Sequence, residues 1–119
     1  MHPDSYTELT SALNAIGLTG QQRSPDLLVV SAQRGPVYPD RGNSFCLSLR
    51  SGSWYLSTWL PACYRIPEGQ DVVAVCSACM GFGTSAMYQV PDEIASRFGL
   101  EEISDDEFER LFPTNDNEG

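Results

Sequence analysis

Four cysteines are the residues of this chain best suited to chemistry, because a thiolate can bind a metal or exchange with a disulfide. Cys76 and Cys79 are separated by a serine and an alanine, a spacing found in half of a zinc site and in thiol-redox motifs. A tetrahedral zinc site normally uses two such close pairs, whereas Cys46 and Cys63 lie far apart in the sequence. We therefore expect no resident cofactor. The alternative is a zinc or thiol-redox site at Cys76 and Cys79.

A structural role explains the same cysteine pair without any cofactor. Cysteine is small and apolar and is often buried. In a helix over residues 71–80, Cys76 and Cys79 would lie on one apolar stripe together with two valines. A strand is the alternative for this segment, because it is rich in valine. A redox pair needs a long helix after it, but Gly81 and Gly83 follow too soon.

Hydrolytic and nucleotide-dependent catalysis lack their usual residues. His2 is the single histidine, and it lies at the chain end, so a nucleophile would have no well-placed imidazole base. No Gly-x-Ser-x-Gly motif is present. The segment 81–85 resembles neither a Walker loop nor a dinucleotide-binding loop. The sequence thus predicts that the protein is not an enzyme.

Acidic residues are concentrated in the second half of the chain. The 119 residues carry a net charge of -9, with 16 acidic residues against 7 basic ones. Residues 1–66 contain five arginines and four acidic residues, which gives a net charge of +1. Residues 67–119 contain two arginines and twelve acidic residues, which gives a net charge of -10. Acidic runs at 92–93 and 105–107 suit the first turns of helices, where they complement the helix dipole. Helix starts therefore explain part of the negative charge. They do not explain why it is concentrated in the second half of the chain, and this uneven distribution suggests a functional role.

This charge argues against two classes of partner. Duplex nucleic acids and anionic membranes attract cationic side chains, and the isoelectric point here is near 4.3. No apolar run reaches the roughly 18 residues that a membrane span needs. The N-terminus has neither the basic start nor the apolar stretch of a signal peptide. We expect a cytoplasmic protein that binds neither nucleic acid nor membrane.

The best-determined element is a β-hairpin at residues 44–60. Phe45, Leu47 and Leu49 alternate with polar residues, and the same alternation resumes after the turn at 51–52. A two-residue turn would place Leu49 opposite Trp54, so that the apolar residues of both strands share one face. A slip by one residue would mix the two faces.

The remaining elements follow from capping signals and periodicity. Ser5 and Glu8 form a capping box that begins an amphipathic helix ending at Gly17. The further predictions are a turn at 19–25, strands at 26–32 and 63–66, a loop at 33–43, an edge strand at 86–90, helices at 91–98 and 104–112, and a disordered acidic tail at 114–119. Together they predict an α+β fold in one domain over residues 1–113. A small, mainly antiparallel sheet centred on the hairpin is packed by an N-terminal helix and two or three C-terminal helices.

The second face of the hairpin is the predicted binding surface. Arg50, Tyr55 and Trp59 lie on it, and these residue types dominate interface hot spots. If a helix covers this face, the same residues belong to the interior. A homodimer through the Trp59 face is a further alternative.

We therefore interpret the chain as a non-enzymatic protein-binding module. Its acidic C-terminal helices, through Asp105, Asp106 and Glu109, would engage a basic partner in the way that an immunity or inhibitor protein does. The alternative is a metal-binding or redox domain that uses Cys76 and Cys79.

Overall fold

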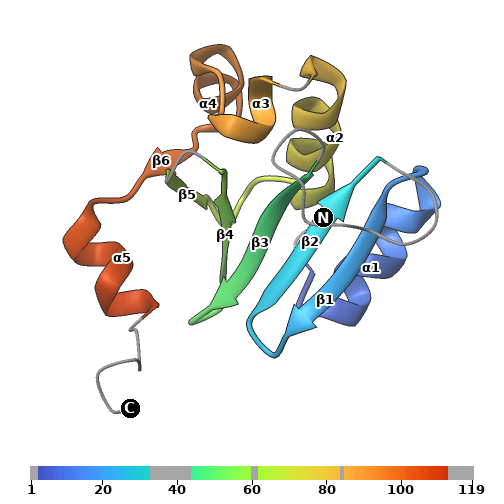
Figure 1. Ribbon diagram of the computed structural model, residues 1–119, viewed down its shortest axis with the longest axis horizontal. Coiled ribbons are helices and arrows are strands. Elements are labelled where there is room, and N and C mark those ends of the chain that lie inside the picture. The colour runs from blue at the N-terminus through green and yellow to red at the C-terminus, as the bar shows by residue number, and fades with distance from the viewer. Residues whose placement is uncertain (1–2, 33–43, 60–61, 84, 113–119) are drawn as a thin grey trace.

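The computed structural model describes residues 3–32, 44–59, 62–83 and 85–112, and these form an α+β fold, as predicted (Figure 1). The predicted loop at 33–43 and tail at 114–119 lie outside the described residues. The elements in chain order are α1 (Tyr6–Ala15), β1 (Thr19–Ser24), β2 (Leu27–Ser31), β3 (Ser44–Arg50), β4 (Ser53–Ser57), β5 (Cys63–Ile66), α2 (Val72–Phe82), α3 (Ser85–Tyr88), α4 (Asp92–Phe98), β6 (Glu101–Glu102) and α5 (Asp105–Leu111).

The sheet is an antiparallel meander in which strands β1 to β6 pair in chain order. The central hairpin has the predicted register, with Leu49 opposite Trp54 and Leu47 opposite Leu56. Ser51 and Gly52 form its turn with φ values of 51° and 80°. Two consecutive positive φ values match the right-handed twist of a two-residue hairpin. The alternation of apolar and polar residues and the geometry of the turn therefore specify the same pairing of the two strands.

The predictions for two segments are wrong. The segment predicted as a turn at 19–25 contains β1 (Thr19–Ser24), a mostly exposed strand that pairs with β2. Its Gly20 lies close to α1 and β2, where an added Cβ would be 3.3 Å from Thr10 Oγ1. The segment predicted as an edge strand at 86–90 instead contains the short helix α3 (Ser85–Tyr88). Pairing with a neighbour makes β1 a strand despite its polar sequence, and packing against α2 favours the helix at α3.

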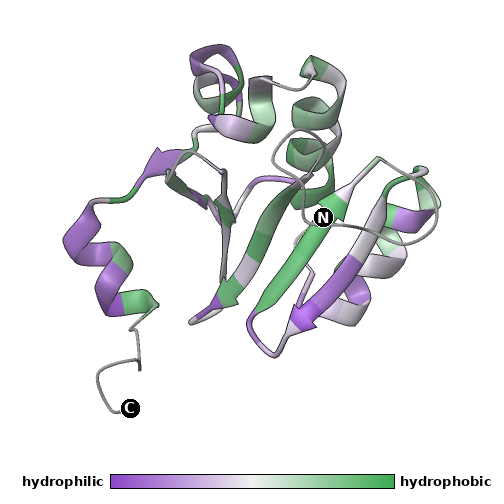
Figure 2. Ribbon diagram, in the orientation of Figure 1, coloured by the Kyte–Doolittle hydropathy of each residue, from purple (hydrophilic) through white to green (hydrophobic). Residues whose placement is uncertain are grey.

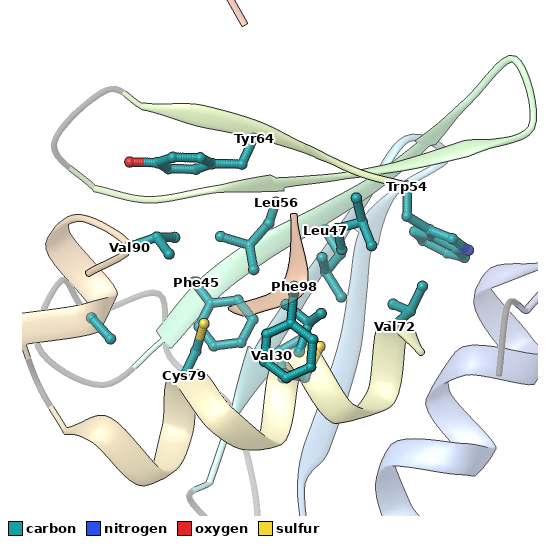
Figure 3. Packing of buried hydrophobic residues seen from close by; sticks show 14 of the residues in the cluster. Val30, Phe45, Leu47, Trp54, Leu56, Tyr64, Val72, Cys79, Val90 and Phe98 are labelled. Atoms are coloured by element: carbon teal, nitrogen blue, oxygen red, sulfur yellow. The ribbon is translucent and has the colours of Figure 1, made fainter. Parts of the chain in front are cut away.

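Helices α1 to α4 pack on one face of the sheet and enclose the main hydrophobic core (Figures 1 and 3). Leu28, Leu47, Leu56 and Tyr64 form one row across four adjacent strands on this face. Trp54 is fully buried, and its Nε1 donates to the Pro3 carbonyl at 2.8 Å. Figure 2 shows that the most hydrophobic elements, β2, β3 and α2, lie around this core.

The capping signals in the sequence mark the helix starts correctly. The Glu8 backbone N–H donates to Ser5 Oγ, while the Glu8 carboxylate accepts from the Asp4 N–H. Asp71 Oδ1 accepts from two N–H groups of α2 and thereby caps it, which confirms the helical prediction for 71–80. No helix among the described residues is long and apolar enough to cross a membrane.

Helix α5 lies away from the other helices (Figure 1). It contacts the opposite face of the sheet, and no residue of α5 itself is fully buried. Figure 2 shows β6 and most of α5 as hydrophilic, with an apolar patch at the C-terminal end of α5.

Candidate functional site

The second face of the sheet is formed by the residues that alternate with those of the core. Cys46 and Cys63 lie on either side of Ser57 in one row, and the adjacent row contains Tyr55 and Arg65. Most of this face is covered. The residues on this face that are less than one tenth exposed are Val29, Ser31, Ser44, Cys46, Ser48, Tyr55 and Cys63.

Phe112, immediately after α5, covers the predicted binding residues Arg50 and Tyr55. The Phe112 and Tyr55 rings meet edge to face, with centroids 5.9 Å apart. The guanidinium carbon of Arg50 lies 4.9 Å from the centroid of the Phe112 ring. Burial raises the pKa of Tyr55. Tyr55 is only 5% exposed, so little of its side chain is open to a partner.

Arg50 is engaged by its own chain. Its Nη2 forms an ion pair with Asp26 at 3.1 Å. Its Nε is buried and has no hydrogen-bond partner among the residues that the structure describes. The stacking on Phe112 and the ion pair together position the guanidinium group over the second face. Arg50 of β3 therefore contacts both the turn between β1 and β2 and the residue that follows α5.

Trp59 is partly buried at the end of the same face. Its Nε1 donates to the Ser44 carbonyl at 2.5 Å, and its backbone N–H donates to the Met87 carbonyl at 3.1 Å. The ring packs against residues of both hydrophobic clusters. These bonds position Trp59 as part of the structure that joins β3, β4 and α3.

A pocket of about 210 Å³ opens between the second face and the start of α5. Ser57 and Cys63 line it from the sheet, and the Ser57 hydroxyl donates to Cys63 Sγ at 3.6 Å. Its lining is more apolar than polar. The residues that line the pocket are Ser57, Thr58, Ala62, Cys63, Glu102, Ile103, Asp105 and Phe108.

Carboxylates dominate the charge around this pocket. Asp105 lines it directly, and Asp106 and Glu109 are exposed on the same helix. Within the described part of the chain these three predicted binding residues take part in no ion pair. Burial is the main cause of the raised pKa of Tyr55 and of Cys63, and the negative charge of Glu107 raises both further. By contrast, Glu101 is paired with Arg65 at 3.0 Å.

The predicted cysteine pair lies in the core, away from this pocket. Cys76 and Cys79 are both fully buried on α2 (Figure 3 labels Cys79). Burial raises the pKa of Cys79 to about 11 and that of Cys76 further, so both thiols stay protonated near neutral pH. Among the described residues no group of three or more histidine, cysteine or acidic side chains could hold a metal ion. The geometry thus adds no support to the metal or redox alternative.

Comparison with known proteins yields no matching family model, no matching curated protein and no matching solved structure.

Sequence reasoning identified Asp105 but missed the other residues of the pocket. The alternation of residues in the hairpin places Ser57 on the second face. Cys63 begins the next predicted strand, which lies beside it in the structure. What the sequence did not show is that α5 crosses to this face. The stripe of Phe108, Leu111 and Phe112 signals an apolar contact but does not specify which surface it meets.

Proposed function

We propose that the protein is a non-enzymatic protein-binding module whose β6–α5 segment engages a basic partner. The observation that supports this proposal best is the set of carboxylates exposed along this segment without ion pairs among the described residues. These are Glu102, Asp105, Asp106 and Glu109.

The surroundings of these carboxylates favour a protein partner. Phe108 is 40% exposed beside them, so the segment combines an aromatic side chain with negative charge. Aromatic side chains supply contact area, and complementary charge accelerates association and selects the partner. An inhibitor or immunity protein that neutralises a basic enzyme would use such a surface.

We place this module in the cytoplasm. All four cysteines are free and buried, and no two of them are joined. Free thiols persist in reducing compartments. The acidic isoelectric point argues against nucleic acid and anionic membranes as partners.

The test is the association rate of a purified basic partner, obtained by capture on the immobilised full chain and then produced separately. Reversing Asp105, Asp106 and Glu109 to lysine should slow association at least about tenfold at low salt, because electrostatic steering is lost. Raising the salt concentration should slow the wild type in the same way.

A matched control changes the same net charge elsewhere. Asp92 and Glu93 occupy the first turn of α4, as Asp105 and Asp106 do in α5, and Glu68 is exposed. Reversing Asp92, Glu93 and Glu68 to lysine should slow association much less. Equal slowing by both triple variants would show an effect of net charge alone and would contradict the proposed surface.

A further inference from the structure

The pocket between the second face and α5 has the size and lining of a receptor for one extended side chain. Its volume is about 210 Å³. Among the residues that line it, Ala62, Ile103 and Phe108 are apolar, whereas Glu102 and Asp105 each carry a carboxylate. This arrangement suits an occupant with an apolar stem and a polar end.

The negative charge around the pocket favours an occupant whose polar end is a cation. Asp105 has no ion pair among the described residues. The negative charge of Glu107 adds to the effect of burial in raising the pKa of Cys63, which lines the pocket. Two arginines on this face of the sheet already have partners: Arg65 binds Glu101, and Arg50 binds Asp26. A phosphate or carboxylate ligand would be repelled here. Lysine and arginine combine an apolar stem with a cation, and they bury the stem while the charge meets a carboxylate.

We propose that this pocket holds a lysine or arginine side chain presented by the basic partner. This inference depends on the function proposed above and specifies the point at which the partner is anchored. The stem lies between Ala62, Ile103 and Phe108, and the cationic group meets Asp105. The exposed carboxylates of Asp106 and Glu109 guide the approach of the partner but do not line the pocket.

The experiment uses the full chain, labelled with ¹⁵N, and two capped amino acids as probes. N-acetyl-arginine methylamide should shift the amide signals of Ala62, Cys63, Ile103 and Phe108 in a saturable way. The matched citrulline derivative has nearly the same shape without the charge, and it should bind at least about tenfold more weakly. Equal binding of both probes, or shifts remote from these residues, would overturn the proposal.

Two variants with the same chemical change test the residue assignment. Asp105→Asn should weaken binding of the arginine probe at least about fivefold, because a carboxylate of the pocket lining is lost. Asp106→Asn removes a neighbouring charge that does not line the pocket and should change the affinity less than twofold. An effect of the same size in both variants would contradict an anchor at Asp105. The unperturbed spectrum of each variant checks that the fold is intact.

The failure of this inference can be distinguished from failure of the proposed function. The double reversal of Asp106 and Glu109 to lysine leaves the pocket lining unchanged. If this variant slows the partner while the arginine probe does not bind the wild type, the acidic surface stands and the pocket proposal is wrong. If the probe binds but neither the double nor the triple reversal affects a protein partner, the assignment to a protein side chain is overturned in favour of a free amine or guanidinium compound.

Discussion

The buried thiols show how position decides the chemistry of a residue. A cysteine that acts as a nucleophile or metal ligand must be a thiolate, and its environment must favour that charge. Here desolvation disfavours the charge: burial raises the pKa of Cys46 and of Cys79 to about 11. These side chains therefore behave as small apolar residues near neutral pH.

These raised pKa values predict a loss of stability in alkali. Because the folded-state pKa is higher than the value of about 8.5 in an unfolded chain, the full contribution of each thiol is present below about pH 8.5. It is then lost as the pH rises toward 11, by up to about 1.4 kcal/mol per pH unit for each thiol. Urea unfolding between pH 7 and pH 11 measures this decline. Cys79→Ala should make the decline shallower, and an unchanged slope would show that Cys79 does not contribute.

Two glycines in the helical part of the chain differ in whether their position requires glycine. Gly99 follows α4 with φ 67° and ψ 30°, and its N–H closes the C-terminal turn. Gly81 lies inside α2, and an added Cβ there would meet no heavy atom within 4 Å. The same substitution should therefore have opposite effects at the two positions.

We expect Gly99→Ala to lower the free energy of unfolding by about 1 kcal/mol, because a left-handed conformation disfavours a Cβ. Gly81→Ala should raise it by about 0.5 kcal/mol, since alanine loses less conformational entropy in a helix. Urea denaturation of both variants beside the wild type checks this pair. A loss of stability in Gly81→Ala would contradict the open space around that position.

The elements that could be predicted from the sequence are those with local signals. The 44–60 hairpin follows from the alternation in both of its strands, and the helix starts at Ser5 and Ser104 follow from their capping residues. By contrast, β1 (Thr19–Ser24) has few strand-favouring residues, and only its pairing with β2 makes it a strand. The covered second face could not be predicted, because the docking of α5 depends on contacts between distant parts of the chain.

For the molecule as a whole, the core and the β6–α5 segment differ in how firmly they are held. The core contains many fully buried side chains from the sheet and α1 to α4. Helix α5 has no buried residue, and Phe112 supplies the aromatic contact with Tyr55 and Arg50. Regions with few buried apolar contacts open locally at low free energy. We therefore expect α5 to open without unfolding of the core.

Hydrogen exchange measured residue by residue tests this expectation. Phe112→Ala should accelerate exchange of the α5 amides about tenfold while the amides of α2 and β3 keep their protection. Phe82→Ala makes the same chemical change at a side chain that is 47% exposed on α2, and it should leave exchange in α5 unchanged. Acceleration across the whole molecule in Phe112→Ala would show that α5 and the core unfold as one unit.

The order of the strands has a consequence for how the chain acquires its structure during synthesis. Because each strand from β2 to β5 pairs with the strand made just before it, every new strand can find its partner already outside the ribosome. Short separations between paired strands keep the entropy cost of each closure small and favour rapid folding. Strand β6 is the exception, because α2, α3 and α4 intervene before it reaches β5. The acidic β6–α5 segment would thus be the last part of the described chain to join the domain.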